Sequence, residues 1–318
     1  MAFKPLACNG KTAVEYLGEK SCPVGGDNCF SFHFFEGARP SQPLLALEVW
    51  DIYPREWPDV CCQAYGRNLS SPLDWAAAAL AAGAQAIALQ LKSIDPNGLD
   101  AGPEPALGLV GELLDKIDVP LIVWGCDNAE KDALVLSTLA ARYAGRKLIL
   151  GPVEEANHKR LAPLAAEYGH TICATTPIDV NLAKQLNILL QNQGVPLEKI
   201  LIDPTTGGLG YGLEYTYSVM ERLRIAALQQ NDQVLALPLI CHLGKEIWKS
   251  KEARQLREEA PEMGEDNRGV FMEISAGVSL LLAGANILVL GHPQSLRGLR
   301  DFIDLLFSPA QAENELWL

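Results

Sequence analysis

The sequence predicts a single α/β domain, a parallel (β/α)8 TIM barrel with a short N-terminal extension. Three observations support this prediction: eight short apolar runs, helix-period segments between them, and a polar residue at the end of most runs. Runs that are apolar throughout are typical of parallel strands covered on both faces. The 318 residues, 48% of them hydrophobic, suffice for one large core of this kind.

The first element is an extension over residues 1–43, which we expect to cap the barrel. Gly25-Gly26-Asp27 predicts a turn, and therefore a hairpin, within it. The barrel follows over residues 44–307, and residues 308–318 form a C-terminal tail. No shift in composition divides the chain further.

The eight expected strands then follow in order. They are residues 44–51, 86–91, 120–127, 147–153, 170–177, 199–204, 236–242 and 286–292. An open, doubly wound sheet is the alternative. No G-x-G-x-x-G follows the first strand, and a count of eight fits closure, so the barrel is favoured.

The helices between the strands have recognisable starts. Ser71-Pro-Leu-Asp74 and Thr176-Pro-Ile-Asp179 each offer a hydroxyl cap, a proline for the first helical position and a carboxylate near the positive helix end. Asn128 and His292 are also typical of helix caps. Residues 244–270 form a long charged excursion after the seventh strand, with a helix-like stretch over 249–260; we expect a docking surface or lid there.

Charge and apolar run length exclude some classes of function. Asp and Glu number 39 against 26 Lys and Arg, a net charge of -13, which argues against nucleic-acid and anionic-membrane partners. No apolar run approaches the ~18 residues that span a bilayer, and the N-terminus does not resemble a signal peptide. A soluble, cytoplasmic protein is expected.

The 8 cysteines include no C-x-x-C pair. Cys126, Cys173 and Cys241 lie in apolar runs, where a thiol packs as a small hydrophobe. Reduced structural thiols are the favoured interpretation, and no metal site is predicted. A cluster built from Cys8, Cys22 and Cys29 is the open alternative.

Polar residues gather at the strand ends, which in a barrel all lie on one face. They are Asp51, Asp127, Asn128, Thr175, Thr176, Asp203, His242, Gly291 and His292. Each could instead cap a helix or tie down a loop, and that interpretation is favoured for Asn128, Thr176 and His292. Asp51, Asp203 and His242 are the stronger candidates for ligand contact.

The loop after the sixth strand is unusually rich in glycine: Asp203-Pro-Thr-Thr-Gly-Gly-Leu-Gly-Tyr-Gly212. Such a loop lets its backbone approach a flat ligand or bind an anion. The next helix begins near Glu214. No G-x-S-x-G nucleophile motif and no H-E-x-x-H metalloprotease motif occurs, so the sequence gives little support for chemistry carried out by this chain alone.

Three segments carry a resemblance to a known family: Gly25-Gly26-Asp27, Leu47-Glu-Val-Trp-Asp51, and the glycine-rich loop continued to Arg222. The chain resembles, from about residue 22 to about 306, the small subunit of the corrinoid iron–sulfur protein. The delta subunit of the acetyl-CoA decarbonylase/synthase complex is the same family.

The resemblance implies a β/α barrel that pairs with a large subunit, which carries a [4Fe–4S] cluster and a corrinoid-binding domain. The shared corrinoid would take a methyl group from methyltetrahydrofolate through a separate methyltransferase. It would pass that group to acetyl-CoA synthase in the reductive acetyl-CoA (Wood–Ljungdahl) pathway. Cobalt then performs the chemistry, which agrees with the missing nucleophile.

By the same resemblance, corrinoid contact is expected from one set of residues. They are Thr205, Thr206, Gly207, Gly208 and Gly210 of the loop, with Asp203, Asp51, His242 and Gly291 at the strand ends. One alternative is a methyltetrahydrofolate-binding methyltransferase barrel, which would bind a pterin through Asp51, Asp127, Asn128 and Asp203. Another is a non-catalytic scaffold for the large subunit.

Overall fold

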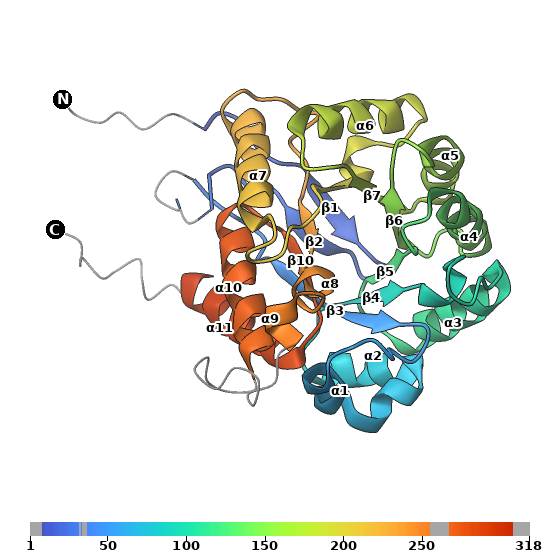
Figure 1. Cartoon of the computed structure of the whole chain (residues 1–318). Helices are drawn as coiled ribbons and strands as arrows, with labels where there is room; N and C mark the ends of the chain where they lie inside the picture. Colours follow the sequence, from blue (N-terminus) through green and yellow to red (C-terminus); the bar gives the residue numbers. More distant parts are fainter. Residues whose placement is uncertain (1–7, 32, 34–36, 255–266, 308–318) are drawn as a thin grey trace.

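A computed structural model describes residues 8–31, 33, 37–254 and 267–307 and confirms the barrel (Figure 1). Its strands are β1 Val14–Leu17, β2 Cys22–Gly25, β3 Leu44–Trp50, β4 Ala86–Gln90, β5 Leu121–Trp124, β6 Ile149–Val153, β7 Thr171–Thr175, β8 Ile200–Asp203, β9 Ile240–His242 and β10 Ile287–Leu290. Its α-helices are α1 Asp59–Tyr65, α2 Pro72–Ala81, α3 Pro103–Lys116, α4 Ala129–Arg142, α5 His158–Tyr168, α6 Val180–Asn192, α7 Leu213–Leu228, α8 Leu243–Ile247, α9 Lys251–Arg254, α10 Arg268–Leu282 and α11 Pro293–Phe307.

Eight parallel strands make the barrel, in the order β8-β7-β6-β5-β4-β3-β10-β9. The two ends of this sheet meet through a parallel bridge between Ile202 and Leu239, so the barrel is nearly closed. The seventh barrel strand is shorter than predicted, because Pro238 has no backbone N–H to donate to a neighbouring strand. The Pro238 carbonyl still accepts from the N–H of Ile202 at 2.9 Å.

Alternation along each strand decides which side chains fill the barrel. On β4, Ile87 and Leu89 pack outward in the large core shared with the helices. Ala86 and Ala88 instead belong to the interior cluster, with Ile122 of β5. The inward residue that follows on each strand therefore lies at the mouth of the barrel, on its carboxyl-terminal face.

The N-terminal extension contains the expected hairpin, but the predicted position of its turn is wrong. β1 and β2 are antiparallel, and the chain reverses over residues 18–21. Gly25 ends β2, where a Cβ atom would stand 2.2 Å from the carbonyl oxygen of Ala13; glycine is needed there for close approach. The Glu15 carboxylate accepts from Thr171 at 2.9 Å and Lys199 at 2.7 Å, so the hairpin lies at the amino-terminal ends of β7 and β8.

Three of the predicted helix caps are confirmed: Ser71, Asn128 and His292 accept from the backbone N–H of Asp74, Lys131 and Gln294. The prediction for Thr176 is wrong. The Asp179 carboxylate caps α6 instead, accepting from Asn181 N–H at 2.7 Å and Leu182 N–H at 3.0 Å. A carboxylate at the positive end of a helix outcompetes an upstream hydroxyl.

The excursion after β9 begins with α8, which precedes the predicted helical stretch over 249–260. Within the described part of that stretch, residues 251–254 are helical and form α9. Residues 255–266, which hold the rest of the predicted stretch, lie outside the described residues, as does the tail 308–318. Both short helices follow the carboxyl end of β9, on the face that carries the candidate site (Figure 1).

Candidate ligand site at the barrel mouth

Asp51 stands immediately after β3, at the barrel mouth. Its carboxylate accepts from the Ser93 N–H at 3.0 Å and from the Ser93 hydroxyl at 2.5 Å. Burial raises the pKa of Asp51, against the effect of these hydrogen bonds. These hydrogen bonds hold the loop after β4. The structure therefore places Asp51 at the mouth, as predicted, but its carboxylate is already hydrogen-bonded within the chain.

Asp203 closes β8 and is fully buried. Its carboxylate accepts from the Thr175 hydroxyl at 3.0 Å and from the Thr205 N–H at 3.1 Å. Burial raises the pKa of Asp203 to about 7, because the charged form loses water that two hydrogen bonds do not replace. Asp203 thus fixes the start of the glycine-rich loop.

The first half of that loop is held by its own hydrogen bonds. Thr205 has φ 60°, a left-handed conformation that is unusual for a β-branched residue. Its hydroxyl donates to the Thr176 carbonyl at 2.6 Å, which helps to hold it there. The Gly207 N–H donates to the Thr216 hydroxyl at 2.8 Å, and a Cβ on Gly207 would lie 2.5 Å from the Gly212 carbonyl.

The second half of the loop presents open backbone and exposed rings. A Cβ on Gly210 would meet nothing within 4 Å, and its φ is 79°. Tyr211 is 59% exposed and Tyr215 is 64% exposed. The Tyr211 hydroxyl donates to the Glu252 carboxylate at 2.9 Å, which joins the loop to α9.

Gly291, the last predicted site residue, has a packing role. Its N–H donates to the buried Glu273 carboxylate at 2.6 Å, and its carbonyl accepts from the Tyr65 hydroxyl at 3.1 Å. A Cβ there would lie 2.6 Å from the Trp248 ring. Only glycine lets that ring cover the end of β10.

The uppermost inward layer of the barrel holds polar atoms without partners. His242 of β9 is 5% exposed and Gln90 of β4 is 0% exposed, and within the described residues neither ring nitrogen of His242 and neither side-chain polar atom of Gln90 has a hydrogen-bond partner. Trp124, paired in register with Gln90, has its ring centroid 3.7 Å from that of the His242 ring. Burial lowers the pKa of His242 to about 3, so the imidazole is neutral, with one donor and one acceptor.

An ion pair bridges the mouth above this layer. Lys245 of α8 binds Asp127, which follows β5 and stands opposite β9 in the strand order. Burial alone would raise the pKa of Asp127, but the Lys245 ammonium, helped by Lys92 and Trp124, lowers it below its usual value. Asp127 and Asn128, predicted together, therefore have different roles: Asp127 forms an ion pair and Asn128 caps α4.

A cavity of about 110 Å³ lies beside the bridge, between β3 and α8. Glu48, Trp50, Lys92, Lys245 and Trp248 are among the residues that line it. Lys92 stands 5.1 Å from the centroid of the Trp50 ring, and burial raises the pKa of Glu48 despite that nearby ammonium. The mouth therefore combines aromatic walls with both charge signs.

Sequence reasoning missed Gln90, Trp124, Glu48 and Lys245. A signal for Gln90 was present: it is the polar residue of an otherwise apolar strand and shares the parity of Ala86 and Ala88. Lys245 carried no such signal, because its partner lies more than a hundred residues away in the sequence.

The described residues contain no group of three His, Cys, Asp or Glu side chains arranged to hold a metal ion. Among them, too, no helix combines the length and apolarity needed to cross a membrane.

Comparison with known proteins establishes the family. The family of CO dehydrogenase/acetyl-CoA synthase delta subunits matches residues 10–292. The chain belongs to this delta-subunit family. It is 32% identical to the acetyl-CoA decarbonylase/synthase complex subunit delta of Methanothermobacter thermautotrophicus, over 92% of this chain and 75% of the relative. It is 32% identical to that of Archaeoglobus fulgidus, over 91% of this chain and 65% of the relative.

Among solved structures, the delta-family chain is similar in fold to dihydropteroate synthases. The Xanthomonas albilineans enzyme with 4-aminobenzoic acid matches with a TM-score of 0.58 at 13% identity, covering 84% of this chain and 95% of that one. The Vibrio fischeri enzyme matches with a TM-score of 0.57 at 13% identity, covering 86% and 95%. At this identity the likeness concerns the barrel alone.

Proposed function

We propose that this chain is the small subunit of a cytoplasmic corrinoid iron–sulfur protein. With a large subunit that carries a [4Fe–4S] cluster, it would hold a corrinoid between the two chains. That corrinoid would accept a methyl group from methyltetrahydrofolate, through a methyltransferase, and pass it to acetyl-CoA synthase in the reductive acetyl-CoA pathway. Membership of the delta-subunit family supports the pathway.

The observation that carries the cofactor part is the unpartnered layer of Gln90 and His242. Buried polar groups in proteins nearly always have partners, so four unpartnered atoms in one layer favour a ligand that supplies them. Together they offer donors and acceptors, the complement of the carboxamide arms around a corrin ring. A ligand arm would reach them once Lys245 parts from Asp127.

The loop would hold the rest of the macrocycle. Gly210 leaves its backbone open, and Tyr211 and Tyr215 provide exposed rings beside it, whereas Gly208 is buried against the backbone of Glu246 in α8. When bound, the corrinoid supplies the cobalt that carries the methyl group. The role of this chain is to bind the ring, orient it and exclude water from one side.

The pterin-binding alternative has weaker support from the geometry. Its four side chains are occupied within the chain: Asp51 by Ser93, Asp203 by Thr175, Asp127 by Lys245, and Asn128 as a helix cap. A pterin would have to displace several of these bonds. The glycine-rich loop and the unpartnered layer would then have no assigned use.

The test is the visible spectrum of the chain, purified without oxygen, alone and with its large subunit. Corrinoid bands that occur only in the two-chain complex, and that change on methyl transfer, are the expected result. A complex that forms without any corrinoid would favour the scaffold alternative. Turnover of methyltetrahydrofolate by the isolated chain would favour the methyltransferase alternative.

A further inference from the structure

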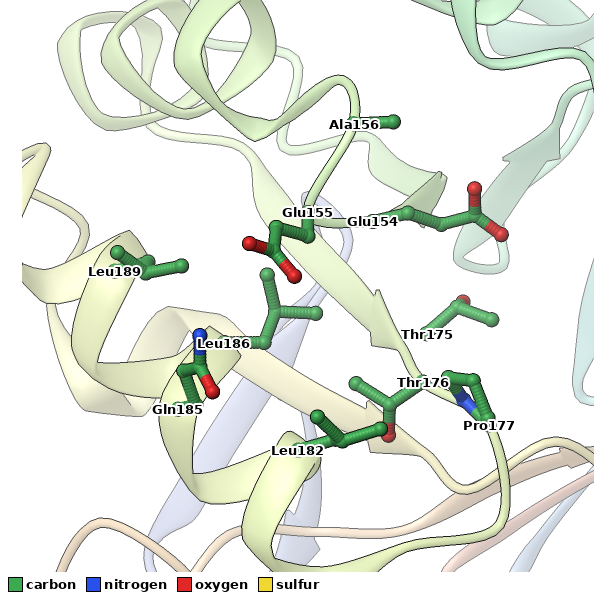
Figure 2. A pocket seen from close by; sticks show the side chains of 10 residues that line it. All are labelled: Glu154, Glu155, Ala156, Thr175, Thr176, Pro177, Leu182, Gln185, Leu186 and Leu189. Atoms are coloured by element: carbon green, nitrogen blue, oxygen red, sulfur yellow. The ribbon is translucent and has the colours of Figure 1, made fainter.

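A second cavity, of about 310 Å³, lies outside the barrel between α6 and the loop that joins β6 to α5 (Figure 2). It opens on the same carboxyl-terminal face as the mouth, at the end of β7. None of its lining residues belongs to the glycine-rich loop or to the unpartnered layer of Gln90 and His242. The roles proposed above therefore leave this cavity unused.

One wall of the cavity is apolar. Leu182, Leu186 and Leu189 recur at helical spacing on α6 and face it together. Leu182 is 40% exposed, although it is a large aliphatic side chain. A wall of this kind suits the aliphatic stem of a ligand rather than a fully hydrated ion.

The opposite wall supplies one negative charge. The Glu155 carboxylate points across the cavity toward Leu186, whereas Glu154 turns away from α6 (Figure 2). In the part of the chain that the structure describes, Glu155 forms no ion pair. An anion would be repelled here, both by Glu155 and by the net charge of -13.

Thr176 closes the cavity at the end of β7. Its side chain is 6% exposed, and its hydroxyl oxygen is buried without a hydrogen-bond partner within the described residues. The hydroxyl points toward Leu182 and away from Glu155 (Figure 2), so a group in the cavity would meet the Thr176 methyl rather than the oxygen. The exposed polar groups that an entering ligand would meet are the Glu155 carboxylate and the Gln185 amide of α6.

We infer that this cavity receives a lysine or arginine side chain from a partner subunit of the acetyl-CoA decarbonylase/synthase complex. The stem would lie on the α6 leucines, and the cationic head would bind the Glu155 carboxylate, with the Gln185 amide beside the opening. Charge complementarity favours this occupant over an acidic or purely apolar one. The inference depends on membership of the complex and not on the corrinoid.

The experiment measures the affinity of the purified full chain for the remaining subunits of the complex, co-purified without it. Glu155→Gln should weaken binding about 10-fold, which is about 1.4 kcal/mol. Leu182→Ala should weaken it by roughly 3-fold, because the stem loses part of its apolar contact with α6. Glu167→Gln, which removes another exposed carboxylate, on α5 and away from the cavity, should leave the affinity unchanged.

A second measurement identifies the partner group directly. Carbodiimide coupling joins a carboxylate to a lysine amine in contact with it, and peptide mapping should recover Glu155 bound to a partner lysine. With either lysine or arginine as the occupant, the effect of Glu155→Gln should diminish at high salt; an arginine gives that salt dependence without the cross-link. Unchanged affinity for both cavity variants would overturn the inference. The inference would also be overturned if n-pentylamine binds in this cavity of the isolated chain while the cavity variants assemble normally. That pair of results would indicate a small-molecule site.

Discussion

Replacement of Gln90 by methionine should stabilise the isolated chain. Met has nearly the shape of Gln but no polar atoms that require partners, and Gln90 is 0% exposed with both polar atoms unpartnered. An unpaired buried polar group costs about 1–3 kcal/mol, so Gln90→Met should raise the free energy of unfolding by about that amount. For a chain of 318 residues this corresponds to a rise in Tm of roughly 1.5–4.5 °C.

Urea unfolding of the isolated chain, followed by circular dichroism, measures the effect. The matched control is Asn286→Leu, because Asn286 is also buried but both polar atoms of its amide have partners: Nδ2 donates to the Asp27 carboxylate at 2.9 Å, and Oδ1 accepts from the Leu239 N–H at 3.0 Å. That variant should lose stability. If Gln90→Met loses 1 kcal/mol or more as well, then Gln90 has a structural partner such as an internal water, and the argument for a ligand fails.

The same variant should behave in the opposite way in the two-chain complex. There the missing amide would weaken corrinoid binding by about 10-fold, if one hydrogen-bonded contact is lost. A gain in stability with a loss of binding is the pattern of a residue retained for function. If binding is unchanged while the stability gain is observed, the unpartnered atoms serve something other than the corrinoid.

Three further predictions concern the mouth. The pKa of Asp203 is raised to about 7, so the folded chain holds this proton more tightly than the unfolded chain does. The free energy of unfolding should therefore fall as pH rises from about 4 to 7. Urea titrations across this pH range should show a shallower fall for Asp203→Asn. Gly207→Ala should cost about 1–3 kcal/mol in the same assay, because the loop has no room for a Cβ, whereas Gly102→Ala, with open space around it, should stay within about 0.5 kcal/mol. Lys245→Met should raise the pKa of Asp127, followed by carboxyl carbon NMR, because burial then acts without the opposing ammonium; an unchanged pKa would show that the ion pair does not control this carboxylate.

The fold could be predicted because its signals are local and repeated. Eight apolar runs identify eight strands, and the topology then follows from rules of connection. The errors have local causes as well. Pro238 shortened β9, and Asp179 displaced Thr176 as the cap of α6, since competition between two nearby caps depends on the path of the backbone. The turn of the hairpin was misplaced because glycine at 25 and 26 serves close approach instead.

The site could be predicted only in part, for a different reason. Sequence identifies which residues end a strand, so Asp203 and His242 were placed on the correct face. It does not show which of them already have partners in the folded chain. That depends on contacts between distant segments, such as the Lys245–Asp127 ion pair and the tilted ring contact between Trp124 and His242.

This distinction divides the mouth into two parts with different expected responses to mutation. Asp203, Thr205 and Gly207 are tied to their own chain, so changes there should act first on stability and on ligand binding only through the loop. Gln90 and His242 contribute unpaired atoms, so changes there should act on binding while stability holds or improves. A loop fixed by its own hydrogen bonds, above a layer whose polar atoms are free to bind, suits a ligand that this chain orients but does not convert. This arrangement is expected of a barrel that positions a cofactor, where the cofactor itself carries out the chemistry.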